Sequence, residues 1–127
     1  MNILLIAVGG AIGAVLRYLT IFASHQIFTQ LKFPIGTFIV NSFGCLVCGI
    51  LYYFLIKNFN NFDIKLKNFL LIGVLGAYTT FSTFSLDFFR LFVASQYLQA
   101  FIYAVLSVVI AILAMFFGFY LSKLIFT

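Results

Sequence analysis

A run of glycines, hydroxyl side chains and aromatic rings lies in the middle of a hydrophobic stretch, from Gly73 to Ser85 (Gly-Val-Leu-Gly-Ala-Tyr-Thr-Thr-Phe-Ser-Thr-Phe-Ser). These residues predict a helix that breaks inside a membrane. Irregular backbone at membrane depth is tolerated only where it is buried in protein or lines an aqueous path, because its N–H and C=O groups need partners. The run therefore marks a candidate site for an ion or a substrate.

Pairs of polar or aromatic residues at helical spacing also occur in the hydrophobic stretches: Thr37 and Asn41, Phe81 and Phe84, and Tyr103 and Ser107. The amide of Asn41 can donate two hydrogen bonds to an anion. The edge of a phenyl ring carries the positive part of its quadrupole, so two ring edges can face an anion without holding it as tightly as a lysine would. Each pair also has an ordinary interpretation, as an interhelical hydrogen bond, core packing or a hydroxyl bonded to its own backbone.

The composition places these residues in a membrane. Of the 127 residues, 65% are hydrophobic and 7% are charged, and the mean hydropathy is +1.25. A short chain of this composition cannot cover a soluble surface. Four stretches approach the roughly 20 apolar residues that cross a bilayer: Ile3–Ala23, Ile35–Ile56, Leu66–Phe89 and Tyr97–Ile125. We therefore expect one all-α domain over residues 1–127, with four transmembrane helices and nothing left for a catalytic or nucleic-acid-binding domain.

Three other features receive ordinary interpretations. Met1 and Asn2 provide no basic region before the first apolar stretch, so a cleaved signal peptide is not expected. Cys45 and Cys48 form a C-x-x-C pair, but redox or metal chemistry needs further ligands and a polar approach, so two small packing residues are favoured. His25 is assigned to the loop region after the first stretch, as a solvated or interfacial residue.

The basic residues are almost evenly divided between the two sides of the membrane that four spans imply. One side holds Lys57, Lys65, Lys67 and Lys123, and the other holds Arg17, Lys32 and Arg90. Because an excess of Lys and Arg on the cytoplasmic side sets the orientation of a membrane protein, a balance of four to three predicts insertion in either orientation. Two oppositely inserted copies can then pair as an antiparallel homodimer.

Small residues and one arginine mark the first stretch. Gly9 and Gly13 form a G-x-x-x-G pattern that lets two helix backbones approach closely, and helix packing is its expected role. Arg17 stands near the expected end of the same helix, where it can either extend to the interface or face a water-filled vestibule. The sequence leaves these two roles open.

Together these positions resemble the Fluc (CrcB) family of fluoride channels over essentially the whole chain. Three motifs carry the resemblance, in the family's order and at its spacing: Gly9-Gly10-x-x-Gly13-Ala14-x-x-Arg17-Tyr18, Gly36-Thr37-x-x-Val40-Asn41-x-x-Gly44 and Gly73-x-x-Gly76-x-x-Thr79-Thr80-Phe81-Ser82-Thr83-Phe84-Ser85. The resemblance implies a fluoride-selective channel of the plasma membrane that exports fluoride passively and lowers its cytoplasmic concentration. It further implies a dual-topology antiparallel homodimer with two pores along the subunit interface and a structural Na⁺ at its centre.

The resemblance also implies roles for single residues. Asn41 would be the pore amide, and the backbone carbonyls of Gly76 and Thr79 would hold the Na⁺. The remaining pore positions would be ring edges, hydroxyls and a vestibule cation: Phe81, Phe84, Tyr103, Ser107, Thr37 and Arg17. Where some relatives continue the hydroxyls of the fourth helix one turn after the serine, this chain has Ala111.

Other classes of protein fit the sequence less well. A small multidrug transporter also pairs four-helix subunits in opposite orientations, but it couples transport to protons through a membrane-embedded carboxylate. The acids here are Asp63, in an expected loop, and Asp87, near an expected helix end, so proton-coupled exchange is not expected. A scaffold subunit that transports nothing would explain the small residues but not polar stripes on three helices. No base, nucleophile or metal cluster converges, so an enzyme is not expected either.

Overall fold

The computed structural model describes residues 2–30, 33–58 and 64–126. Four helical segments in these ranges are long and apolar enough to cross a membrane: Asn2–Ile27, Ile35–Asn58, Ile64–Val93 and Tyr97–Phe126. Each extends the span expected from the sequence by at most four residues at either end. The expected all-α membrane architecture with four apolar spans is therefore confirmed.

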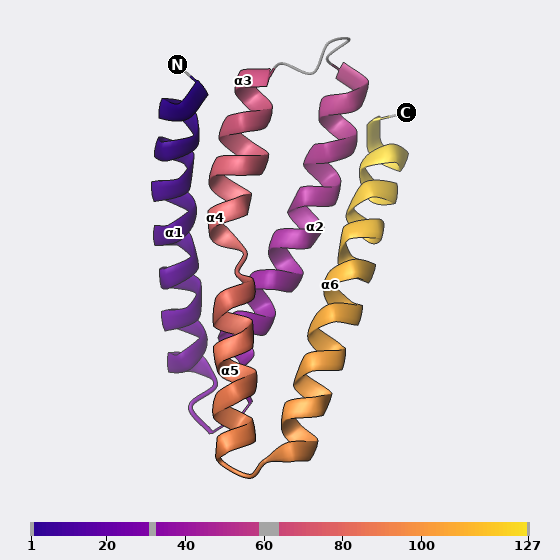
Figure 1. Cartoon of the computed structure of the whole chain (residues 1–127). Helices are drawn as coiled ribbons and strands as arrows, with labels where there is room; N and C mark the ends of the chain where they lie inside the picture. The colour runs from indigo at the N-terminus through magenta and orange to yellow at the C-terminus, as the bar shows by residue number, and fades with distance from the viewer. Residues whose placement is uncertain (1, 31–32, 59–63, 127) are drawn as a thin grey trace.

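The third span consists of several helical elements, whereas each of the others is a single helix. The elements are α1 (Asn2–Ile27), α2 (Ile35–Asn58), α3 (Ile64–Lys67), η1 (Asn68–Leu75), α4 (Gly76–Tyr78), α5 (Phe81–Val93) and α6 (Tyr97–Phe126). The η1 element is a π-helix, in which backbone hydrogen bonds reach one residue further than in an α-helix. Thr79 and Thr80 have extended backbones between α4 and α5, and we call them the extended pair. Figure 1 shows the ribbon leaving its helical course at this point.

Glycines let α1 pack closely on η1 and α4. A Cβ atom built on Gly9 would lie 2.6 Å from the carbonyl oxygen of Phe69, and one built on Gly13 would overlap the carbonyl oxygen of Val74. Gly73 of η1 faces Gly9 in turn, because a Cβ built on it would lie 3.0 Å from the Gly9 Cα. The G-x-x-x-G pattern thus serves helix packing, as expected.

The α2 and α6 helices run side by side in the same direction (Figure 1). A Cβ atom built on Gly49 of α2 would overlap the carbonyl oxygen of Met115, and one built on Gly118 of α6 would overlap that of Leu46. Each helix therefore presents a glycine to the backbone of the other. This close pairing fixes the depth at which residues of α6 face residues of α2.

A tight turn reverses the chain between α5 and α6. The N–H of Gln96 donates to the carbonyl of Leu91 at 2.9 Å, and the N–H of Ser95 donates to the carbonyl of Phe92 at 3.0 Å. These two bonds form a Schellman motif, and Ser95 occupies its left-handed position with φ 59°. The turn brings α6 back along α5, which allows Tyr103 to pack against Phe84.

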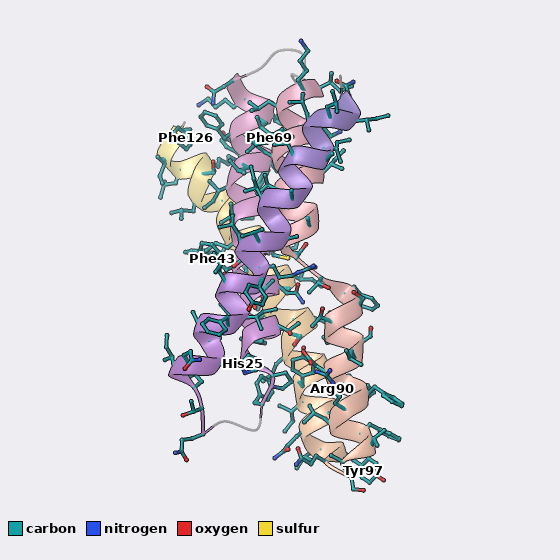
Figure 2. All side chains as sticks on the ribbon, turned by 90° about the vertical axis from the view of Figure 1, so that its left-hand side faces the viewer. His25, Phe43, Phe69, Arg90, Tyr97 and Phe126 are labelled. Atoms are coloured by element: carbon teal, nitrogen blue, oxygen red, sulfur yellow. The ribbon has the colours of Figure 1, made fainter. Side chains whose placement is uncertain are left out.

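Few side chains in the bundle are fully enclosed. Val40, Tyr103 and Ser122 are 0% exposed, whereas large apolar side chains are exposed along all four spans. Figure 2 shows these carbon-rich side chains over the length of the bundle, with Phe69 and Phe126 toward one end and His25 and Arg90 toward the other. An apolar outer surface is what lipid or a second apolar chain would cover.

Helices longer than expected place three titratable residues differently from the sequence prediction. His25 is exposed in the last turn of α1 and not in a loop. Arg17 lies ten residues before the end of α1, about 15 Å along the helix axis, so the expectation that it stands near a helix end was wrong. Asp87 is the central residue of α5, so its expected place near a helix end was also wrong. Lys32 and Asp63 lie outside the described residues.

Candidate functional site

Asn41 of α2 holds the extended pair through both ends of its amide. Its Oδ1 accepts a hydrogen bond from the N–H of Thr80 at 2.8 Å, and its Nδ2 donates to the carbonyl of Thr80 at 3.0 Å. Because the amide nitrogen carries two N–H bonds, one of them is left for another acceptor. Asn41 therefore makes the interhelical hydrogen bond and also keeps a spare donor.

The extended pair redirects N–H groups that would otherwise continue the helix. In an uninterrupted α-helix the carbonyl of residue i accepts from the N–H of residue i+4. The N–H of Thr80 donates instead to Asn41, and the N–H of Thr83 donates to the Oγ1 of Thr80 at 3.2 Å, an N-cap contact. The carbonyls of Gly76 and Thr79 thereby lose the partners that a continuous helix would give them.

A cavity of about 420 Å³ lies at the extended pair, and we call it the Asn41 cavity. Its walls come from α2, α4, α5, α6 and the extended pair: Asn41, Cys45, Gly76, Thr79, Thr80, Phe81, Phe84, Ser107, Val108, Ala111 and Ile112. The α5 helix begins at this cavity, and a helix N-terminus carries a partial positive charge. The lining of this one cavity thus includes four of the seven expected pore residues and both expected Na⁺ residues.

Aromatic rings continue from the cavity along α5 and α6. The ring centroids of Phe81 and Phe84 are 5.4 Å apart, and those of Phe84 and Tyr103 are 5.3 Å apart. Phe81 is 76% exposed, whereas Tyr103 is enclosed and meets Phe33 edge to face at 5.3 Å. The Phe81 ring is thus accessible at the cavity, and Tyr103 belongs to the packed interior.

Asp87 joins two of the expected hydroxyl residues. Its Oδ2 accepts a hydrogen bond from the Oγ1 of Thr37 at 2.6 Å and a longer one from the hydroxyl of Tyr103 at 3.5 Å. Its Oδ1 lies 3.7 Å from the Nη1 of Arg90, and its side chain is 12% exposed. In this conformation the hydroxyls of Thr37 and Tyr103 are directed at a carboxylate and not into the Asn41 cavity.

Asp87 belongs to this region, although it was expected near a helix end and was not among the candidate site residues. It follows Phe84 by three residues, just as Phe84 follows Phe81, so each of these side chains is the neighbour of the next along α5. The spacing that grouped the two rings would therefore have included Asp87. It was left out because the expected helix ended at Phe89, which placed the acid near the membrane surface.

The α6 helix contributes one hydroxyl, that of Ser107, and three apolar side chains to the Asn41 cavity. Among the described residues, the buried Oγ of Ser107 makes no hydrogen bond of ordinary length and angle, although the Tyr103 hydroxyl lies nearby. A buried hydroxyl without a partner is costly, so this group is suited to meet an acceptor that enters the cavity. Ala111, one turn further along, lines the same cavity and offers no donor.

Arg17 belongs neither to the Asn41 cavity nor to the Asp87 contacts. It is half-buried on α1, which packs on η1, α4 and α2. Gly13 and Thr20 lie on either side of Arg17 along α1, and both approach Tyr78 at the end of α4. Arg17 therefore lies near the depth of the extended pair, and its expected place at a vestibule stays a prediction.

The two cysteines line cavities at the same level. A second cavity of about 390 Å³, here called the Cys48 cavity, includes Cys48, Leu71 and Met115 and shares Cys45, Gly76, Thr79, Ala111 and Ile112 with the Asn41 cavity. Both cysteines are free and half-buried. They therefore border open space as well as packed side chains.

Comparison with known proteins identifies the family. The family described as "CrcB-like protein, Camphor Resistance (CrcB)" matches residues 4–119. A protein of Flavobacterium psychrophilum named "Fluoride-specific ion channel FluC" is 41% identical over 122 residues, which cover 96% of this chain and 97% of that protein. A protein of the same name from Campylobacter fetus subsp. fetus is 41% identical over 122 residues, covering 96% and 94%. "Fluoride-specific ion channel FluC 1" of Staphylococcus aureus is 42% identical over 118 residues, 93% of each chain. Because the match extends over nearly the whole chain, the protein belongs to the CrcB family.

Proposed function

We propose that the protein is a fluoride-selective channel that exports fluoride passively across the plasma membrane and so lowers fluoride in the cytoplasm. The observation that carries this proposal is the Asn41 cavity. There the spare N–H of Asn41, the unpartnered hydroxyl of Ser107 and the exposed ring of Phe81 meet at the N-terminal end of α5. The name of these relatives, fluoride-specific ion channel, supports the same substrate and indicates a channel and not an enzyme.

Neutral donors suit the passage of fluoride. The ion is small and strongly hydrated, so a pore that removes its water must offer hydrogen-bond donors in return. Conduction needs binding that is favourable enough for the ion to enter and weak enough for it to leave. An amide, a hydroxyl and ring edges meet both conditions, whereas a fixed ammonium group would retain the ion. A negative interior potential supplies about 2.3 kcal/mol per 100 mV to move each anion outward, so export needs no further energy source.

We also propose that two chains inserted in opposite orientations form an antiparallel homodimer. The near balance of basic residues between the two sides supports either orientation. Several residues of the Asn41 cavity are exposed in a single chain, among them Phe81 at 76%, Val108 at 49% and Ile112 at 52%. A second copy would cover these apolar side chains and add its own rings to the cavity wall.

Within this dimer we propose a structural Na⁺ held by the carbonyls of Gly76 and Thr79 from both chains. The helical partners of these carbonyls are diverted to Asn41 and Thr80, which leaves oxygen ligands of the kind that coordinate monovalent cations. Among the described residues no group of three or more His, Cys, Asp or Glu side chains comes together, so the ligands would be backbone oxygens. The ion would supply a fixed positive charge and join the two extended pairs.

A proton-coupled multidrug transporter is the alternative, and Asp87 is the residue that would serve it. Its carboxylate lies at the centre of α5 and is mostly buried, so its position does not exclude proton coupling. The names of the relatives and the neutral donors of the Asn41 cavity favour fluoride. The two functions differ in their dependence on a proton gradient.

Efflux from liposomes separates these functions. We expect purified protein in liposomes loaded with fluoride to release it when a potassium ionophore sets the potential, with equal pH on both sides. Matched liposomes loaded with chloride should release chloride at least a hundredfold more slowly than the first liposomes release fluoride. Fluoride release that requires a pH gradient, or chloride release at a similar rate, would contradict the proposal.

A further inference from the structure

Cys45 and Cys48 place two thiols one helical turn apart beside the Asn41 cavity. Cys45 lines this cavity together with Asn41, which precedes it by four residues on the same face of α2. Cys45 and Cys48 both line the Cys48 cavity. Both thiols are free and half-buried, so each reaches open space next to the proposed fluoride path.

The spacing of the two thiols fits a single two-coordinate metal ion. Side chains three residues apart on a helix have Cβ atoms about 5–6 Å from each other. Thiolate sulfur binds metals at about 2.3 Å, so two sulfurs on opposite sides of one ion lie about 4.6 Å apart. Since no third His, Cys, Asp or Glu joins them among the described residues, the pair suits soft ions that accept two thiolates and not a four-ligand Zn²⁺ site.

We propose that Cys45 and Cys48 form a two-thiolate site for a soft monovalent cation such as Ag⁺ or Cu⁺, and that filling it stops ion flow through the Asn41 cavity. On binding, the two S–H bonds release two protons to water and two sulfur–metal bonds form, with no transfer of electrons. The loaded site carries two thiolate charges and one cation charge, a net charge of −1. The effect on flow rests on the proposed channel function, whereas binding of the metal does not.

A negative charge at this position would oppose an anion. Cys45 and Asn41 are one helical turn apart, about 6 Å. At an effective dielectric constant of about 20, one unit of charge at that distance lowers the rate of anion passage about a hundredfold. A divalent soft ion such as Hg²⁺ would bind the same two thiolates and leave the loaded site with no net charge. Comparison of Ag⁺ with Hg²⁺ therefore separates the effect of charge from that of bulk.

Binding is tested first, with Ag⁺ and without any transport measurement. The natural chain has only two cysteines, so the Cys45→Ser/Cys48→Ser variant is a thiol-free control. We expect one Ag⁺ and two released protons per chain in the parent, and affinity at least a hundredfold lower in the control and in each single serine variant. Equal affinity in parent and thiol-free protein would overturn the site.

Transport is tested next, in chloride-free liposomes, with each variant compared with its own rate before metal is added. In the parent, we expect Ag⁺ to slow fluoride efflux about a hundredfold and Hg²⁺ to slow it no more than about tenfold. Neither ion should change efflux through the thiol-free variant. Ag⁺ bound without any change in efflux, or equal slowing by both ions, would overturn the electrostatic block. If the untreated parent releases no fluoride, the channel proposal fails while the Ag⁺ titration still decides the site.

Discussion

Asn41 and Thr80 exchange two hydrogen bonds, at 2.8 and 3.0 Å, that join the second span to the extended pair in the third. The two bonds fix both ends of the amide and therefore set the direction of its remaining N–H. One side chain thus stabilises the interrupted backbone and positions a donor at the Asn41 cavity. Removal of the whole side chain would disturb both roles, so a test of function must change the donor and keep the acceptor.

The substitution Asn41→Asp makes this change. The carboxylate can still accept from the N–H of Thr80, but it cannot donate to the carbonyl of Thr80 or to an anion. We expect fluoride efflux to fall at least a hundredfold and the free energy of unfolding to fall by about 1–3 kcal/mol. Efflux from liposomes and dimer size in detergent are the measurements. Asn58→Asp, at an exposed position at the end of the same helix, is the control and should conduct normally. Normal conduction by Asn41→Asp would show that the Asn41 amide does not contact the passing ion.

Replacement of Phe81 or Phe84 by isoleucine separates a ring edge from apolar bulk. Isoleucine keeps most of the apolar burial and removes the ring quadrupole, so both variants should form dimers while efflux falls at least tenfold. Phe84 packs on Tyr103, so we expect Phe84→Ile to lower the free energy of unfolding by about 1 kcal/mol, whereas Phe81 is 76% exposed in the single chain and contributes little to its internal packing. Phe89→Ile, on an exposed part of α5 outside the cavity, should leave efflux unchanged. Isoleucine variants that assemble and conduct like the parent would show that the rings only pack.

Removal of Na⁺ should slow or stop fluoride efflux if the carbonyls of Gly76 and Thr79 hold the ion. Replacement of Na⁺ on both sides of the liposome membrane by an organic cation too large for the site tests this directly. Thr79→Ser should be nearly silent, because backbone oxygen does the binding and serine keeps the hydroxyl that donates to the carbonyl of Leu75 at 2.9 Å. Efflux that is indifferent to Na⁺, or a changed Na⁺ dependence in Thr79→Ser, would contradict a site made of these carbonyls.

Added lysines should separate the two orientations of the chain. Thr29→Lys, Gln30→Lys and Gln99→Lys add charge at exposed positions on one side, and Asn2→Lys with Asn58→Lys adds it on the other. Since Lys and Arg bias orientation, each variant expressed alone should show less than about a tenth of parental efflux, and co-expression of both should restore it. Full activity from one biased variant would exclude the antiparallel pair.

Gly10 and Gly13 provide a matched test of helix packing. A Cβ built on Gly13 would overlap the carbonyl oxygen of Val74, whereas one built on Gly10 meets no atom within 4 Å. We expect Gly13→Ala to lower the free energy of unfolding by about 1–3 kcal/mol through forced separation of α1 from the third span. Gly10→Ala should be neutral or stabilise the helix by up to about 1 kcal/mol. Heating in detergent followed by size analysis measures both, and equal losses would contradict the packing described for α1.

The sequence alone was sufficient to locate the four apolar spans, because bilayer thickness sets their length and hydropathy marks their position. It also grouped Phe81 with Phe84 and Asn41 with Thr37, because helical periodicity determines which residues of one helix share a face. The same periodicity extends to Asp87, but an expected helix end at Phe89 hid it. Helix ends are weakly specified by hydropathy, since the last turns pass gradually into the membrane interface.

Contacts between spans were decided only by the tertiary structure. Thr37 and Asp87 are 50 residues apart in sequence, and their 2.6 Å hydrogen bond depends on the rotation and depth of two helices. The glycine contacts of α1 with η1 and of α2 with α6 fix in the same way how those helices lie against each other, because their backbones touch there. The periodicity of a single helix carries no information about either quantity. For the same reason, the two hydrogen bonds of Asn41 with Thr80 follow from packing, although the local run of glycines and hydroxyls already predicted that the helix breaks between Gly73 and Ser85.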